Sequence, residues 1–474
     1  MMVSLITLIY ILSACLLAVY AASEMVLLLI YWRTRHHAQP VPTVANWPEV
    51  TIQLPIYNER YVVTRLLEAV SRLDYPRERL CIQVLDDSTD DTGEIARQVA
   101  QSLAQGGMNI QYLHRDQRTD YKAGALVYGM AQHDSEFMVV LDADFVPPPD
   151  FLRRTIPYLV ADPSLGMVQT RWGHLNPFTN PLTLGQALAL DAHFVVEQTA
   201  RSRAGLLMSF NGSGGVWRTA CIHDAGGWRA ETLTEDLDLS YRAQLAGWRL
   251  LYLPDVVVPG ELPPQITAYK RQQARWATGS TQVLWAQFGA LWHSRFTVSQ
   301  RVMATLHLCQ YLPHPLMVLL LLLTPPLVLT RSLNHLALGW LGIVSVGPPL
   351  VYIISQQALY TDWKKRLLGF PVLLLLSTGI AWSNTRAVVQ SLGRQRLTFQ
   401  RTPKFVQQWQ TSSYALHLDA NTWIEAALAV YALWGAALAW RTNPSLVIYL
   451  VIYGLAFLSV VVWSIRESWL LRRG

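Results

Sequence analysis

Residues 137–149 read FMVVLDADFVPPP, a short apolar run that ends in two aspartates, Asp142 and Asp144. The run has the length and composition of a buried β-strand. Residues 49–59 (EVTIQLPIYNE) and 80–92 (LCIQVLDDSTDDT) repeat the pattern, and segments with helical spacing of apolar residues follow them. Strands that alternate with helices predict an α/β domain with a mostly parallel sheet and helices on both faces.

The acids of this predicted sheet come at strand ends, where open parallel sheets bind their ligands. An acid at such a place can also cap a helix or form a turn, which is the better interpretation for Asp90 and Asp91. Asp142 and Asp144 are separated by one residue and should point the same way. Their hard oxygen ligands suit Mg²⁺ or Mn²⁺ shared with a substrate diphosphate. The acids at predicted strand ends are Asp86, Asp87, Asp142 and Asp144.

The composition indicates a membrane protein with one large aqueous domain. Hydrophobic residues make up 51% of the chain and charged residues only 15%, which is apolar for a soluble protein. Residues 3–31 carry one charge, and apolar runs of spanning length recur from about residue 302, whereas residues 45–290 have a mixed composition. The first segment lacks a basic start and is too long for a signal peptide, so we expect a retained anchor.

Basic residues cluster at the edges of the apolar segments, as the positive-inside rule expects. The net charge of +6 therefore reflects membrane topology, and no nucleic-acid partner is predicted. The same bias places the apolar run 367–385 along the interface or as a re-entrant segment, and the aqueous domain in the cytosol. The predicted spans are 6–30, 302–329, 335–358, 423–440 and 445–464. The predicted units are an N-terminal helix (1–32), the aqueous domain (45–290), two helices (300–360), an interfacial segment with a loop (362–410), two helices (420–466) and a cytosolic tail (467–474).

Four cysteines, Cys15, Cys81, Cys221 and Cys309, lie far apart with no CxxC pair. Neither a zinc site nor a disulfide framework is indicated. We expect reduced, structural thiols, which fit a cytosolic domain.

Four motifs in order, DDS (86–88), DAD (142–144), TED (234–236) and QQARW (272–276), resemble the signature of processive family 2 glycosyltransferases. This group includes the cellulose, chitin and hyaluronan synthases. The segments FNGSGGVWR (210–218) and ELPPQITAYKRQQARWATGS (261–280) look like the cellulose-synthase-like A and C branch and its bacterial relatives. The resemblance covers roughly residues 48–290 and implies a GT-A fold that transfers a hexose with inversion from a nucleotide diphosphate sugar.

The resemblance also implies roles for the acids and one lysine. Asp86 and Asp87 would contact the nucleoside, and Asp142 and Asp144 would engage the diphosphate through the cation. Lys122 matches a lysine near the donor, although a solvated lysine at a helix start fits the sequence equally well. Asp236, with Glu235 beside it, matches the catalytic base; the TED triplet could also cap the helix that follows. A general base contributes typically 10²–10⁴-fold to such a transfer.

On a helix, Gln272, Arg275 and Trp276 share one face. By the family pattern, Gln272 and Arg275 bind the donor and the Trp276 indole offers a flat surface to the acceptor sugar, since arginine can meet a diphosphate bidentately. The alternative for Trp276 is an anchor at the membrane surface, which is the expected role of Trp285 and Trp292.

Two loops complete the predicted site. Asn211, Gly212 and Ser213 match an acceptor-side loop whose small residues let a backbone approach a sugar. The segment FQRTPK (399–404) is similar to a gating loop, which makes Thr402 a candidate gating residue even though Arg401 replaces the usual valine. VQTRW (168–172) matches a further loop with arginine where proline often stands.

The sequence therefore predicts a metal-dependent, inverting hexosyltransferase of the inner membrane. It would polymerise a β-linked glucan or mannan from UDP-glucose or GDP-mannose and thread the product through its own helices. Its partners would be the sugar nucleotide, the growing polysaccharide and the lipid bilayer; export partners are not defined by the sequence. The alternative is transfer of one sugar to a membrane lipid. Transport alone is disfavoured, because Glu24 and Glu425 are the only acids in the predicted spans and no ion relay is evident.

Overall fold

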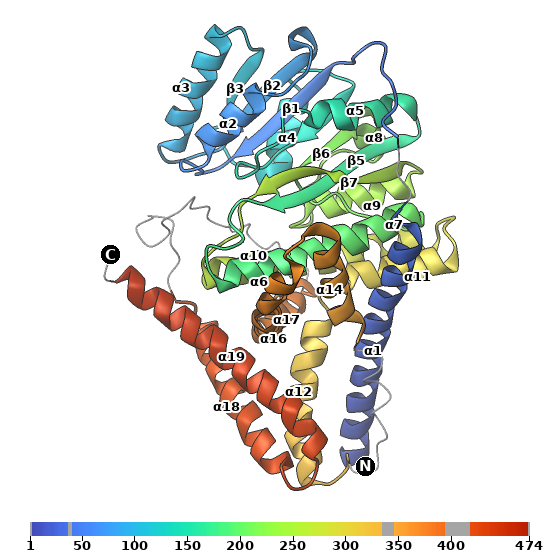
Figure 1. The fold of residues 1–474 in the computed structure, drawn as a ribbon, viewed down its shortest axis with the longest axis vertical. Helices are drawn as coiled ribbons and strands as arrows, with labels where there is room; N and C mark the ends of the chain where they lie inside the picture. The colour runs from blue at the N-terminus through green and yellow to red at the C-terminus, as the bar shows by residue number, and fades with distance from the viewer. Residues whose placement is uncertain (1, 37–39, 334–345, 394–417, 473–474) are drawn as a thin grey trace.

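A seven-stranded sheet forms the centre of the α/β domain in the computed structural model, which describes residues 2–36, 40–333, 346–393 and 418–472 (Figure 1). The strand order is β3-β2-β1-β4-β6-β5-β7. Pairs β1–β2, β1–β4, β2–β3 and β5–β7 are parallel, and only β6 runs antiparallel to its neighbours, so the predicted mostly parallel sheet is confirmed. The strands are β1 (Val50–Ile56), β2 (Leu80–Asp86), β3 (Ile110–His114), β4 (Phe137–Val140), β5 (Leu165–His174), β6 (Gly215–Arg218) and β7 (Arg249–Gly260).

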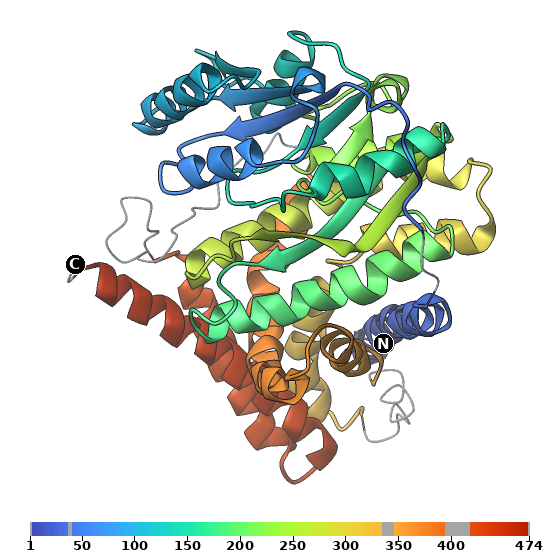
Figure 2. The same ribbon diagram turned by 45° about the horizontal axis from the view of Figure 1, so that its top comes forward.

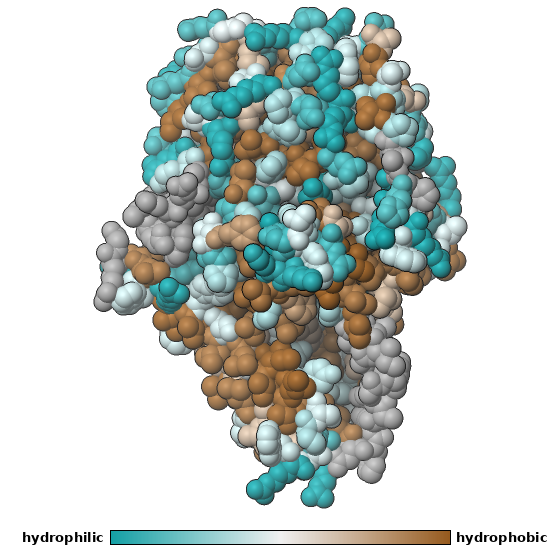
Figure 3. Space-filling view, in the orientation of Figure 1, coloured by the Kyte–Doolittle hydropathy of each residue, from teal (hydrophilic) through white to brown (hydrophobic). Residues whose placement is uncertain are grey.

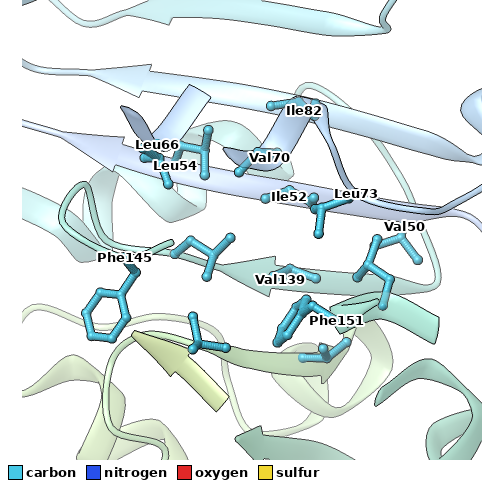
Figure 4. Packing of buried hydrophobic residues seen from close by; sticks show 14 of the residues in the cluster. Val50, Ile52, Leu54, Leu66, Val70, Leu73, Ile82, Val139, Phe145 and Phe151 are labelled. Carbon is cyan, nitrogen blue, oxygen red and sulfur yellow. The ribbon is translucent and has the colours of Figure 1, made fainter. Parts of the chain in front are cut away.

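Apolar cores lie on both faces of the sheet. Successive strand side chains point to opposite faces, so Val139 of β4 packs with one core and Met138 with the other. The first core joins Ile52 and Leu54 to Phe151 and other residues of the covering helices (Figure 4). These helices are α2 (Val63–Ser71), α3 (Thr92–Gln105) and α5 (Phe151–Ala161) on this face, and α4 (Tyr121–Met130), α8 (Thr219–Asp224) and α9 (Glu235–Leu245) on the other.

A layer of helices separates this domain from the long apolar helices (Figures 1 and 2). Its main member is α10 (Ile266–Trp292), which lies across the lower edge of the sheet beside α6 (Pro181–Ala192). A π-helical turn (His193–Gln198) and α7 (Thr199–Arg203) continue α6. Helix α17 (Ala381–Ser391) packs on α10 through Ala387 and Val388 against Ala277.

The long helices extend away from this layer and carry an apolar surface (Figure 3). By length and composition, four described helical stretches can cross a membrane: Leu5–Thr34, Trp363–Ser391, Asn421–Ala439 and Pro444–Leu471. A fifth would be the pair α11 (Val298–Leu308) and α12 (Pro313–Leu329), bent by 67° where Pro313 starts a new helix. Exposed apolar side chains such as Leu8, Val430 and Ile448 would be unfavourable in water, so a bilayer is the environment that this surface fits.

Three of the predicted spans, 6–30, 423–440 and 445–464, lie within or coincide with α1 (Met2–Thr34), α18 (Asn421–Ala439) and α19 (Pro444–Leu471). Span 302–329 corresponds to the bent pair. Half of 335–358 lies outside the described residues, and the rest forms α14 (Gly347–Leu359). The run 367–385 belongs to α16 (Phe370–Gly379) and α17, which follow the short α15 (Trp363–Arg366). Leu376 of α16 lies against Gly185 of α6. The interfacial placement of this run stays a prediction.

Candidate active site

Two cavities meet beneath the sheet. The first, of about 170 Å³, lies at the carboxyl ends of β1, β2 and β4, where the sequence predicted the ligand. The second, of about 520 Å³, lies between the α/β domain and helices α1, α10, α11 and α14. We call the residues that line both cavities the junction; they are Trp172, Leu190, Asn211, Thr234, Asp236, Gln272 and Trp276.

Lys122 at the start of α4 links three parts of the first cavity. Its Nζ donates to Asp142 Oδ1 at 2.6 Å and to the Gly212 carbonyl at 2.7 Å, and lies 3.7 Å from Glu235 Oε1. Burial opposes the charged form, but Asp142, Glu235 and Asp236 together raise the pKa of Lys122. The side chain is thus a cation held by hydrogen bonds within the site, with 18% of its surface exposed, and not a solvated lysine at a helix start.

Asp142 and Asp144 follow β4, and both line the first cavity. Asp144 Oδ2 accepts from the Glu261 backbone N–H at 3.3 Å, which fixes its orientation. Among the described residues, no group of three or more His, Cys, Asp or Glu side chains could hold a metal ion. Two carboxylates at a cavity wall fit Mg²⁺ or Mn²⁺, because these ions often take one or two protein carboxylates and fill their other positions with phosphate and water.

Asp236 lies at the junction, near the start of α9. Its Oδ1 accepts from the Leu237 backbone N–H at 2.8 Å, and Thr234 makes no side-chain cap to this helix. Burial raises the pKa of Asp236 to about 7, and the Glu235 charge adds to the rise while Lys122 and Arg275 oppose it. A carboxyl group with this pKa can exchange a proton near neutral pH.

Gly212 brings the backbone against Asp236. It has φ +87°, and a Cβ at this position would lie 2.7 Å from Asp236 Oδ2. Only glycine combines this left-handed conformation with so close an approach. The preceding Asn211 lines both cavities, donates to His193 Nε2 at 2.9 Å and accepts from Gln198 Nε2 at 2.5 Å.

The α10 face predicted from QQARW points into the site. Gln272 and Trp276 belong to the junction, and Arg275 lines the first cavity. In contrast, Trp285 is 64% exposed on the same helix, as expected of an anchor at a membrane surface.

Two predicted site residues do not line either cavity. Asp86 is fully buried and accepts from Tyr112 Oη at 2.7 Å, Ser88 N at 3.0 Å and His114 Nδ1 at 3.0 Å. Ser213 is also buried, and its hydroxyl accepts from the Asp142 backbone N–H at 3.0 Å. Both side chains therefore hold loops in place, and the contacts of Asp86 with a nucleoside and of Ser213 with an acceptor stay predictions.

Asp87, by contrast, does line the first cavity, although its carboxylate is already paired with Arg115. The guanidinium donates to both oxygens, at 2.7 and 2.5 Å. Thr402 lies outside the described residues.

Comparison with known proteins identifies the α/β domain. Residues 48–279 match the family model described as "Glycosyltransferase like family 2". They form a family 2 glycosyltransferase domain. Among its relatives, glucomannan 4-beta-mannosyltransferase 2 of Arabidopsis thaliana is 42% identical over 273 residues, which are 55% of this chain and 51% of that protein. Glucomannan 4-beta-mannosyltransferase 1 of Oryza sativa subsp. japonica is 43% identical over 255 residues, 52% of this chain and 49% of that protein. The chain spans about half the length of these relatives.

A solved structure shows the fold. The mannosyltransferase PcManGT from Pyrobaculum calidifontis, in complex with GDP-Man and Mn²⁺, aligns with 81% of this chain and 99% of its own, at a TM-score of 0.55 and 21% identity. The family 2 domain therefore has the GT-A fold that the resemblance predicted.

The family 2 domain also contains site residues that the sequence did not single out. The Trp172 indole lies at the junction and donates to the Ser213 carbonyl at 2.9 Å. Arg118 lines the first cavity with its guanidinium 3.5 Å from the centre of the Tyr57 ring and 5.0 Å from that of Tyr121. Burial lowers the pKa of Arg118. The VQTRW motif (168–172) contains Trp172 and so was a signal for this residue. The contact of Arg118 with Tyr57 follows from no local sequence pattern.

Proposed function

We propose that this chain is a membrane-bound, inverting hexosyltransferase that extends a β-linked polysaccharide of the glucan or mannan type. The supporting observation is the junction, whose residues line both a cavity that contains Asp142, Asp144 and Arg275 and a larger cavity beside the apolar helices. A donor in the first cavity and an acceptor in the second would meet at Asp236. The names of the relatives, and GDP-Man in the structural neighbour, make GDP-mannose the first donor to test.

The second cavity has the lining that a polysaccharide acceptor needs. Aromatic rings offer flat faces to pyranose rings, and amide and carboxylate side chains can bind hydroxyl groups. Tyr269, Trp276, Tyr311 and Tyr352 supply the first kind of contact, and Gln186, Asn211, Gln272 and Gln310 the second.

In the proposed reaction, Asp236 accepts the proton of the acceptor hydroxyl as the acceptor oxygen bonds to the anomeric carbon of the donor. The bond from that carbon to the diphosphate oxygen breaks on the opposite side, so the anomeric configuration inverts. Arg275 and Lys122 place positive charge near the leaving diphosphate, and Asp87 and Gln272 contribute to donor binding. Asp142 and Asp144 would hold Mg²⁺ or Mn²⁺, which when bound neutralises diphosphate charge. Burial and then the Glu235 charge keep the Asp236 pKa high. Trp276, Asn211 and Gly212 form the acceptor side.

We further propose that the domain faces the cytosol at the plasma membrane. Arg33 lies in the last turn of α1 and Arg35 directly follows that helix, on the side that leads into the domain. Lys364, Lys365 and Arg366 lie in α15, after the apolar helices that follow the domain. This bias agrees with a cytosolic domain and a supply of sugar nucleotide from the same side.

A donor panel tests the proposal. The purified full-length chain is incubated with radiolabelled GDP-mannose, UDP-glucose or UDP-N-acetylglucosamine and with Mg²⁺ or Mn²⁺, and Asp236→Asn serves as the inactive control. We expect insoluble product from GDP-mannose or UDP-glucose that mannanase or glucanase digests. A labelled lipid that carries one sugar would contradict polymer synthesis, and no transfer from any donor would contradict the transferase function.

A further inference from the structure

The first residue of α10 is capped by a carboxylate from the last helix of the chain. Glu467 of α19 accepts from the Ile266 backbone N–H through both oxygens, at 2.9 and 3.0 Å, and is 3% exposed. Helix N-termini carry unpaired N–H groups, and a carboxyl oxygen that accepts from one of them satisfies a donor that would otherwise have no partner. The sequence assigned residues 467–474 to a tail, but α19 runs to Leu471 and its end is tied to the catalytic domain.

A second buried carboxylate holds the next turn of α10. Lys270 Nζ lies 2.7 Å from Oε1 and 2.8 Å from Oε2 of Glu425 in α18, and the two side chains are 3% and 0% exposed. The sequence placed Glu425 near the end of a span and gave it no partner. A buried ion pair contributes little net stability compared with apolar residues, and its better-supported use is to specify one arrangement of two elements.

Lys270 lies on the side of α10 opposite to the junction. At about 100° per residue, it is separated by roughly 120–160° around the helix axis from Gln272, Arg275 and Trp276. The clamp formed by Glu425 and Glu467 therefore holds one side of α10 while the other side lines the cavities. A rotation or slide of α10 along its axis would move Trp276 and Arg275 together.

We propose that Glu425 and Glu467 are positioning residues that set the rotation and axial position of α10 for sugar transfer. The Lys270–Glu425 ion pair and the Glu467 cap specify how α10 is placed, and the ion pair is not needed for folding. This inference rests on the proposed transferase function with a polymer as its product.

The test replaces the ion pair by apolar residues, Lys270→Met together with Glu425→Leu, in the full-length chain. Apolar replacement of a buried pair is often neutral or stabilising, so the thermal midpoint should not fall. Donor Kd should stay within about twofold, whereas acceptor KM should rise and kcat fall by about 10-fold or more, because small displacements of positioning groups cost up to about 10²-fold. The matched control is Glu94→Ala with Arg97→Ala, a half-exposed ion pair on α3, which should change none of these quantities.

Glu467→Gln is the second variant, because its amide oxygen can still accept from the Ile266 N–H while the other accepting oxygen is replaced by an NH₂ group. It should keep the fold, raise acceptor KM by about 3-fold or more and shorten the product. Unchanged transfer kinetics in both variants would overturn the inference. A loss of kcat in proportion to lost folded protein, with acceptor KM and product length unchanged, would also overturn it. An inactive wild-type chain would instead contradict the proposed function, since the inference compares each variant with an active wild type.

Discussion

At the scale of single residues, the Asp236 carboxyl carries the proposed chemistry. Its pKa is raised to about 7, first by burial and then by Glu235. Only the deprotonated form can accept the acceptor proton, so kcat/KM should rise as pH increases through about 7 and level off above it. Initial rates over about pH 5–9 at fixed donor and cation measure this. A rate independent of pH between about 5 and 8 would contradict the assignment.

Removing the charge of Asp236 gives a second prediction. Asp236→Asn keeps the shape of the side chain but removes the proton acceptor, so transfer should fall by about 10²–10⁴-fold. Calorimetry should show donor binding within a few-fold of wild type, because the proposed donor contacts are made by other side chains. Asp74→Asn, a change at an exposed carboxylate that pairs with Arg153 and lines neither cavity, is the control and should not affect transfer.

Gly212 gives a prediction about geometry alone. In Gly212→Ala the new Cβ would approach Asp236 Oδ2 to 2.7 Å, so the base must shift, and we expect about a 10–100-fold loss of kcat. Gly227 also has positive φ, at +75°, but a Cβ there would meet nothing within 4 Å. Gly227→Ala therefore controls for backbone strain and should keep kcat while lowering stability slightly. Equal losses of kcat in the two variants would show that strain, and not contact with Asp236, is responsible.

At the scale of elements, α10 joins the catalytic domain to the membrane helices, and two of its tryptophans should behave differently. Trp276→Ala removes the flat surface at the junction and should raise acceptor KM by about 10-fold or more, with donor Kd unchanged; aromatic contacts of this kind are worth about 1–3 kcal/mol in related stacking sites. Trp285→Ala changes an exposed residue of the same helix and should leave both constants unchanged. Loss of donor binding in Trp276→Ala would contradict an acceptor role.

The sequence predicts elements better than it predicts partners between elements. The strands ending near Asp86 and Asp142 and the helical face of Gln272 and Trp276 follow from local periodicity, so they are found without a structure. The exclusion of Asp86 from the cavity depends on Tyr112 and His114, which belong to the neighbouring strand, and no local pattern shows that pairing. The Lys270–Glu425 contact joins residues 155 positions apart, which a span-by-span interpretation of charge could not detect.

At the scale of the whole molecule, the second cavity is lined both by the junction and by residues of helices α1, α10, α11 and α14. A chain that grows at Asp236 has to leave the first cavity, where each new donor binds. Its older units would then enter the cavity walled by α1, α10, α11 and α14. Synthesis and passage into the membrane region would thus be one process, which a soluble transferase of the same fold could not perform.

This coupling predicts where the product accumulates. In sealed vesicles, only molecules with an outward-facing catalytic domain can use donor added outside, and their polymer should collect in the lumen. Labelled product should therefore resist added mannanase or glucanase until detergent opens the vesicles. Vesicles with Asp236→Asn control for trapped donor and should contain no polymer. Polymer that is digested fully without detergent would show that synthesis occurs without translocation, and the second cavity would then serve only to bind the acceptor.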